Sequence, residues 1–152
     1  MGNFEKIFRS LNKAKIRYLV VGGVAVNIYG YPRFTGDLDI LLLLEKDNLE
    51  KMENVMDELG YKTRLPVDIK ELQDHKQVKK WLKEKNMTAF VFFPSGENFL
   101  MIDVLVEDSL KFQEAEENKV IKKFDDVKIP VIAIDKLIKM KKRQKGLRIW
   151  KI

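Results

Sequence analysis

The chain has 152 residues, of which 45% are hydrophobic and 34% charged, and its formal net charge is +6. This composition is that of an ordinary globular protein, and it excludes an intrinsically disordered chain. Cysteine is absent, which excludes disulfides and thiolate metal sites, and the single histidine, His75, leaves little for an imidazole site.

The length predicts one domain spanning residues 1–152. The N-terminal segment lacks the apolar stretch of a signal peptide. No window reaches the ~18–20 apolar residues that a membrane-spanning helix needs. The sequence therefore predicts a cytoplasmic protein without a membrane partner.

The positive charge is concentrated at the C-terminal end. Residues 136–152 hold eight basic side chains and no acidic one. Such a segment favours a polyanionic partner, for example a nucleotide or RNA. A solvated helix end whose lysines suit the helix dipole explains the same charge. Charge alone leaves both interpretations open.

The predicted elements alternate between helices and strands. Residues 4–15 carry Phe4, Ile7, Phe8 and Leu11 at helical spacing. Further helices are expected over residues 24–30, 47–60, 69–85, 109–119 and 133–145, with Asp47, Ser109 and Asp135 as candidate N-caps and Gly30 and Gly60 ending two of the helices.

The strands are expected over residues 17–23, 37–44, 61–65, 88–93, 98–107, 119–124 and 127–133. The run at 37–44 is too apolar for a solvated face and is expected to be central in the sheet. The last two pairs of strands are expected to form hairpins. An α/β (α+β) fold with a mixed central β-sheet flanked by helices follows.

Two carboxylates open the central strand, at Asp37 and Asp39. Side chains alternate along a strand, so these two project from the same face and can converge on a divalent cation. Mg²⁺ prefers such hard oxygen ligands together with substrate phosphates. An inert, solvated strand entrance is the alternative interpretation.

Asp103 is the one polar residue in the apolar run of residues 99–106. Burying an unpaired charge costs several kcal/mol, so Asp103 needs a partner. A lysine could serve, but a cation shared with Asp37 and Asp39 would satisfy all three acids. The sequence therefore favours a metal site built by these aspartates.

Gly22 and Gly23 stand between a predicted strand and a short helix. Glycines allow backbone N–H groups to approach a phosphate at a helix N-terminus, although a tight turn could need them equally. The chain has neither a P-loop nor a dinucleotide-binding fingerprint, which disfavours P-loop kinases and dehydrogenases.

The segment VGGVAVNIYGYPRFTGDLDI, residues 21–40, closely resembles the signature of the nucleotidyltransferase fold, the DNA polymerase β-like superfamily. In that superfamily a glycine pair precedes a D-x-D motif, and a third aspartate follows on a later strand. The pattern G-x-x-R-x-T-x-D-x-D, which includes Arg33, resembles the small prokaryotic branch of abortive-infection toxins and minimal nucleotidyltransferases.

The resemblance implies transfer of an NMP from an NTP to a hydroxyl or phosphate acceptor. Asp37, Asp39 and Asp103 would be the catalytic residues and would bind two Mg²⁺, with Mn²⁺ an alternative. Gly22 and Gly23 would hold the nucleotide. The acceptor, whether RNA or tRNA, protein or small molecule, stays open. The alternative is an inactive or antitoxin-like module of the same fold that binds a partner protein or RNA.

Two basic residues complete the predicted nucleotide site. Arg33 could clamp the triphosphate, or it could be a solvated loop residue. The helical wheel places Lys141 between Leu137 and Ile138, within an apolar arc that also includes Ile134, while Lys136 falls on the water face. An inward lysine must reach outward to solvent or meet an anion such as the triphosphate.

Overall fold

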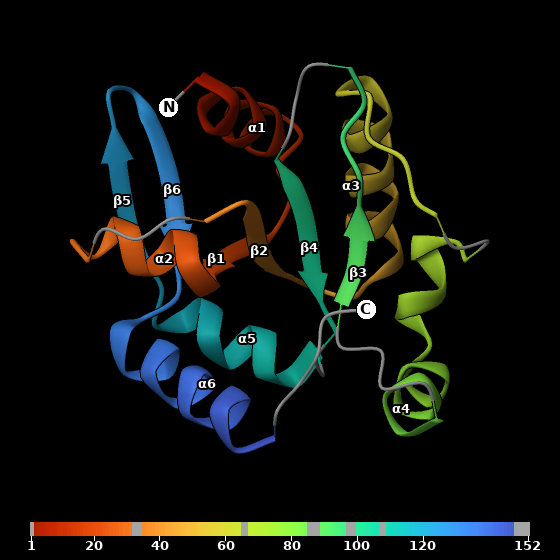
Figure 1. Ribbon diagram of the computed structural model, residues 1–152. Helices are drawn as coiled ribbons and strands as arrows, with labels where there is room; N and C mark the ends of the chain where they lie inside the picture. The colour runs from red at the N-terminus through yellow and green to blue at the C-terminus, as the bar shows by residue number, and fades with distance from the viewer. Residues whose placement is uncertain are drawn as a thin grey trace.

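A six-stranded β-sheet forms the centre of the structure, a computed structural model that describes residues 2–31, 35–64, 67–84, 89–96, 100–106 and 109–147 (Figure 1). The strand order is β3-β4-β2-β1-β6-β5. The strands are β1 Tyr18–Val21, β2 Asp37–Leu42, β3 Ala89–Phe92, β4 Met101–Leu105, β5 Val120–Phe124 and β6 Val127–Val131. Pairs β1–β2, β3–β4 and β5–β6 are antiparallel, whereas β1–β6 and β2–β4 are parallel. The predicted mixed sheet, with a central second strand and two hairpins, is confirmed.

Helices flank this sheet (Figure 1). They are α1 Gly2–Lys13, α2 Gly22–Ile28, α3 Lys46–Glu58, the 3₁₀ helix η1 Ile69–Gln73, α4 His75–Glu84, α5 Ser109–Glu117 and α6 Ile134–Leu147. Helix α1 contacts β6 and α3, and η1 lies between α3 and α4. Helices α5 and α6 lie side by side in Figure 1, joined by an ion pair between Glu114 and Lys136 at 3.3 Å. Within the described ranges, no helix has the length and apolar character needed to cross a bilayer.

Two helices end in the way that their glycines predict. Gly30 has φ +101° after α2, and Gly60 has φ +81° after α3. At the second end, the N–H of Gly60 donates to Asp57 O and the N–H of Tyr61 donates to Met56 O, at 3.1 and 2.9 Å. This is a Schellman end, in which glycine adopts a left-handed conformation that other residues avoid.

Two predicted elements are wrong. Residues 61–64, the described part of the strand predicted over residues 61–65, form no strand and pair with the described sheet through a single bridge between Lys62 and Phe93. The helix predicted over residues 69–85 is divided into η1 and α4 at Asp74, whose backbone is extended. The Asp74 carboxylate accepts hydrogen bonds from the N–H groups of Lys76 and Gln77, so it starts a new helix instead of continuing the first.

Two predicted N-caps also lie elsewhere. The cap of α3 is Glu45, and Asp47 lies inside the first turn. Asp135 likewise lies in the first turn of α6. Acidic side chains in a first turn still interact favourably with the helix dipole, which explains why the same residue type marks both positions. The side chain of Ser109, the third predicted cap, lies outside the described part of the chain.

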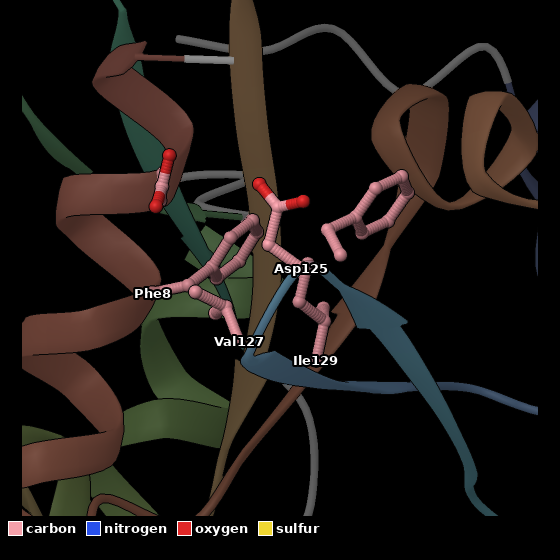
Figure 2. A pocket seen from close by; sticks show the side chains of 6 residues that line it. Phe8, Asp125, Val127 and Ile129 are labelled. Atoms are coloured by element: carbon pink, nitrogen blue, oxygen red, sulfur yellow. The ribbon is translucent and has the colours of Figure 1, made fainter.

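The β5–β6 hairpin packs one of its faces against α1. Figure 2 shows Phe8 of α1 beside Val127 and Ile129 of β6, around a small pocket of about 90 Å³ below the turn at Asp125. Val127 and Ile129 are buried. Because side chains alternate along a strand, the residue between them, Lys128, lies on the opposite face of the hairpin.

A buried asparagine joins β1 to β2, the strand that carries two of the metal-binding candidates. Asn48 on α3 is only 6% exposed. Its Oδ1 accepts a hydrogen bond from the N–H of Arg17 at 2.8 Å, and its Nδ2 donates to the carbonyl oxygens of Arg17 and Leu43, both at 3.0 Å. Arg17 precedes β1 and Leu43 follows β2, so one side chain bonds the backbone at both strand ends.

We expect Asn48→Ala to lower the free energy of unfolding by about 2 kcal/mol, because the N–H of Arg17 and the buried carbonyl oxygen of Leu43 lose the side chain that bonds them. Urea denaturation measures the loss. Asn118→Ala is the matched control, since Asn118 is exposed and its side chain donates to Glu114 O of its own helix end, at 3.2 Å. Equal losses in the two variants would contradict the assignment of Asn48 as a joint between the strands.

Candidate metal and nucleotide site

Three carboxylates converge on the two central strands. Asp37 and Asp39 project from the same face of β2, and the parallel pairing with β4 places Asp103 directly opposite Asp39. One carboxylate oxygen from each residue lies within 4.8 Å of the others. The structure therefore brings together all three acids that the sequence singled out.

The donor set fits a hard divalent cation. Two ligands of one Mg²⁺, each bound at about 2.0–2.1 Å, can be no more than about 4.2 Å apart. Oxygens within 4.8 Å of one another can close on one ion after small side-chain rotations, or they can bridge a pair of ions at the usual ~3.5–4 Å separation. Carboxylate oxygens are also the ligand type that Mg²⁺ and Mn²⁺ prefer.

Two of the three acids lie where the fold excludes most water, and Asp37 is half-buried. Asp103 is 2% exposed and Asp39 is 8% exposed. Interactions between charges are screened less at such positions than on a solvated surface. A cation held there would consequently interact strongly with the carboxylates.

Gly22 lies against one of these carboxylates, that of Asp39. It follows β1 directly and has φ +66°, in the left-handed region. A Cβ built on Gly22 would collide with Asp39 Oδ2 and would lie 2.9 Å from Asp39 Cβ. The space of its missing side chain is therefore occupied by the Asp39 carboxylate, and the approach of its backbone N–H to a phosphate stays a prediction.

Hydrogen bonds hold the far end of α2 and the segment that enters β2. Gly23 is the second residue of α2, half-buried at the end of β1. The hydroxyl of Tyr29, at the far end of this helix, donates to Ile132 O at 2.7 Å, and burial together with the charge of Asp135 raises the pKa of Tyr29. The Thr35 hydroxyl donates to Asp37 O at 2.8 Å and so braces the chain that enters β2.

Of the two cationic residues predicted for the nucleotide site, the structure describes Lys141. Arg33 lies outside the described residues. Lys141 is half-buried on α6, but the apolar arc that framed its prediction is only partly correct. Leu137 is 5% exposed, whereas Ile134 and Ile138 are 47% and 49% exposed.

Helix α6 is therefore rotated relative to the predicted wheel. Lys136, which was expected to face water, pairs with Glu114 of α5 and has 22% of its side chain exposed. The ion pair turns Lys136 toward α5, and Leu137 is buried among its neighbours. Both are tertiary contacts, which a helical wheel does not contain.

Comparison with known proteins identifies the fold. No family model matches the sequence, and no curated protein matches it. The structure is similar to TM1012 of Thermotoga maritima, a protein assigned as a nucleotidyltransferase, with a TM-score of 0.61, 13% identity, and coverage of 96% of this chain and 84% of that one.

It is also similar to the lincosamide antibiotic adenylyltransferase LnuA in its lincomycin-bound form, with a TM-score of 0.54, 16% identity, and coverage of 88% of this chain and 80% of that one. The chain has the nucleotidyltransferase fold.

Gly22→Ala tests the contact between the turn and Asp39. Gly30→Ala is the matched control, because Gly30 also has positive φ but a Cβ added there would have no atom within 4 Å. We expect Gly30→Ala to cost about 1–2 kcal/mol of backbone strain. Gly22→Ala should cost more, and it should weaken the thermal response to Mn²⁺ because Asp39 must move. Equal losses and an unchanged Mn²⁺ response would show that the contact is unimportant.

The candidate metal site predicts that a bound cation stabilises the protein. At a Mg²⁺ or Mn²⁺ concentration ten times the Kd, binding should add about 1.4 kcal/mol to the free energy of unfolding. Asp39→Asn and Asp103→Asn should remove this gain, measured as the shift in melting temperature. Asp57→Asn, on the exposed side of α3, is the control and should keep it. A gain that persists in Asp103→Asn would place the ion elsewhere.

Proposed function

We propose that the protein is a metal-dependent nucleotidyltransferase that moves an NMP from an NTP to a hydroxyl or phosphate acceptor and releases pyrophosphate. The observation that supports this most is the convergence of the Asp37, Asp39 and Asp103 carboxylates within 4.8 Å beside the Gly22 turn. The nucleotidyltransferase fold is consistent with it. In the proposed reaction an acceptor oxygen bonds to the α-phosphorus of the NTP, and the bond from that phosphorus to pyrophosphate breaks.

The aspartates have distinct proposed roles. Asp37 and Asp39 would hold two Mg²⁺ ions, with Mn²⁺ an alternative, and Asp103 would hold one of them. When bound, such ions activate the acceptor oxygen and offset charge on the leaving pyrophosphate. Asp103 is paired directly opposite Asp39, which suits it to share an ion with that residue.

The triphosphate is proposed to lie along the start of α2. Backbone N–H groups at Gly22 and Gly23 would face its oxygens, where the helix dipole also favours negative charge. Arg33 and Lys141 would supply cations. Helix α6 contacts α2, which supports a place for Lys141 near the same end of the sheet.

The acceptor is proposed only by class. RNA or tRNA, a protein, or a small molecule with a free hydroxyl all offer the required oxygen. The binding of lincomycin by LnuA is a property of that enzyme and leaves the choice open for this chain. A toxin–antitoxin-like role with a partner protein, in the cytoplasm, is part of the same proposal.

Incubation with each α-labelled NTP, Mg²⁺ and candidate acceptors tests the activity. We expect transfer of label to one acceptor with stoichiometric release of pyrophosphate. Asp39→Asn should lower the rate by about 100-fold or more, as expected when a group that stabilises transition-state charge is removed.

Asp57→Asn serves as the control and should retain the full rate. Pyrophosphate release that is equal in Asp39→Asn and in the unmodified protein would refute the proposed site. NTP binding without turnover of any nucleotide would instead support the binding-module alternative.

A further inference from the structure

The sheet continues beyond the three aspartates onto β4 and β3. One row of paired residues crosses β1, β2, β4 and β3, and it consists of Val21, Asp39, Asp103 and Val91. Directly paired residues point to the same face of a sheet, so Val91 lies beside Asp103 on the face that carries the acids. Gly22, where the triphosphate is proposed to lie, follows Val21 at the β1 end of this row. The β3 end lies on the other side of the acids.

The acid-bearing face of β3 and β4 is apolar and only partly covered. Met101, which is paired with Asp37, is half-buried, and so are Val91 and Phe93. We call these three side chains the β3–β4 strip. The opposite face of the same two strands belongs to the core, and its buried side chains are Phe90, Phe92, Ile102 and Val104. Apolar side chains that stay within reach of solvent next to a polar site are characteristic of ligand-binding surfaces.

A cation lies flat at the far end of the strip. Phe93 continues the alternation of β3, so its ring lies on the same face as Val91. The guanidinium carbon of Arg64 is 3.9 Å from the centre of this ring. A guanidinium stacked on an aromatic ring presents its N–H donors at its edge, where they fit a carboxylate or a phosphate. Arg64 is exposed and forms no ion pair with any residue that the structure describes.

The segment that carries Arg64 is fixed to both strands of the strip. Lys62 and Phe93 exchange two backbone hydrogen bonds, of 2.9 and 2.7 Å. The hydroxyl of Tyr61, which is buried, donates to Leu100 O at 2.7 Å, directly before β4 begins. These bonds hold the backbone of the segment in a defined position relative to the acids.

Protection of the sheet edge does not explain the position of Arg64. Cations on an edge segment deter edge-to-edge pairing, and that reason accounts for the exposed Lys62. The guanidinium of Arg64 lies instead over the ring of Phe93, on the face of the sheet. The stack therefore places a positive charge beside apolar side chains on the same face as the acids.

We propose that the β3–β4 strip and Arg64 bind the acceptor, and that this acceptor is a small anionic molecule. The inference rests on the proposed nucleotidyl transfer, in which the acceptor oxygen and the leaving pyrophosphate are roughly in line across the α-phosphorus. With the pyrophosphate beside α2 and β1, the acceptor approaches from the side of β4 and β3. Its oxygen bonds to the α-phosphorus, its proton passes to solvent, and the bond to pyrophosphate breaks.

The spacing of the residues limits the size of this acceptor. Phe93 is a diagonal neighbour of Asp103 across the β3–β4 pair, so their backbones are about 7–8 Å apart. A single sugar or aromatic ring spans that separation, with its hydroxyl toward the ion at Asp103 and its carboxylate or phosphate at Arg64. The nucleobase of the NTP carries no charge for Arg64, and the triphosphate is proposed to lie at the opposite end of the row, beside Gly22.

Titration of phenyl phosphate and of benzoate, followed by ligand-observed NMR, tests the site in EDTA without NTP. Both probes carry a ring and an oxyanion, and their comparison shows whether phosphate or carboxylate is preferred. Arg64→Gln should raise the Kd of the preferred probe by about tenfold or more, because a hydrogen bond to a charged group is lost. Phe93→Leu should raise it by about two- to fivefold, because the ring that holds the guanidinium is lost.

Lys123→Gln is the matched control, because Lys123 is an exposed cation on β5, at the opposite edge of the sheet. It should leave both Kd values unchanged, and Asp39→Asn should not weaken binding, since neither metal nor NTP is present. Absence of binding of both probes, or an unchanged Kd in Arg64→Gln, would overturn the proposal. Equally tight binding of benzyl alcohol, which carries no charge, would overturn it too.

The transfer assay provides the second readout. Arg64→Gln should raise the KM of the acceptor and leave the KM of the NTP and the melting temperature unchanged, whereas a purely structural role would alter all three. An RNA or protein acceptor whose KM is the same in Arg64→Gln would contradict the assignment. Loss of oxyanion binding in Arg64→Gln, combined with absence of transfer from every NTP, would refute nucleotidyl transfer and leave an oxyanion-binding site.

Discussion

The parallel pairing of β2 with β4 is the constraint on which the candidate site depends. Because it places Asp39 opposite Asp103, the carboxylates share one face, while Leu38, Ile40, Ile102 and Val104 share the other and are completely buried. A shift of one residue in either strand would expose two of these apolar side chains and separate the acids. The hydrophobic effect on one face of the sheet thus determines the arrangement of charges on the other.

The Gly22 turn adds a second requirement to that geometry. Its positive φ directs the chain from β1 into α2, and its missing side chain leaves the space that the Asp39 carboxylate occupies. The two glycines that begin α2 therefore differ in what they do. Gly22 leaves space for an acidic side chain in addition to its proposed backbone contact with a phosphate, whereas the proposed role of Gly23 is the backbone contact alone. A larger residue at either position would affect the site, but for separate physical reasons.

The sequence predicted most of the sheet and the convergence of the three acids, because strand alternation and apolar runs are local signals. It failed where a side chain competes with the backbone, as at Asp74, which divides one predicted helix into two. It also failed for part of α6, where Ile134 and Ile138 are about half exposed and Lys136 pairs with Glu114 of α5, because contacts with another helix are not local signals. The close approach of the Asp39 carboxylate to Gly22 joins residues that are distant along the chain, so no local pattern could reveal it.

The Asn48 bonds lie at one end of the β1–β2 pair, beside the register pair Tyr18 and Leu42. The aspartates lie at the other end, where Val21 pairs with Asp39. The two strands are thus anchored far from the acids. Thermal opening of this pair should begin at the acidic end, and amide hydrogens there should exchange with solvent sooner than those beside Arg17. Fast local fluctuation of the site and slow unfolding of the sheet can therefore coexist in the same two strands.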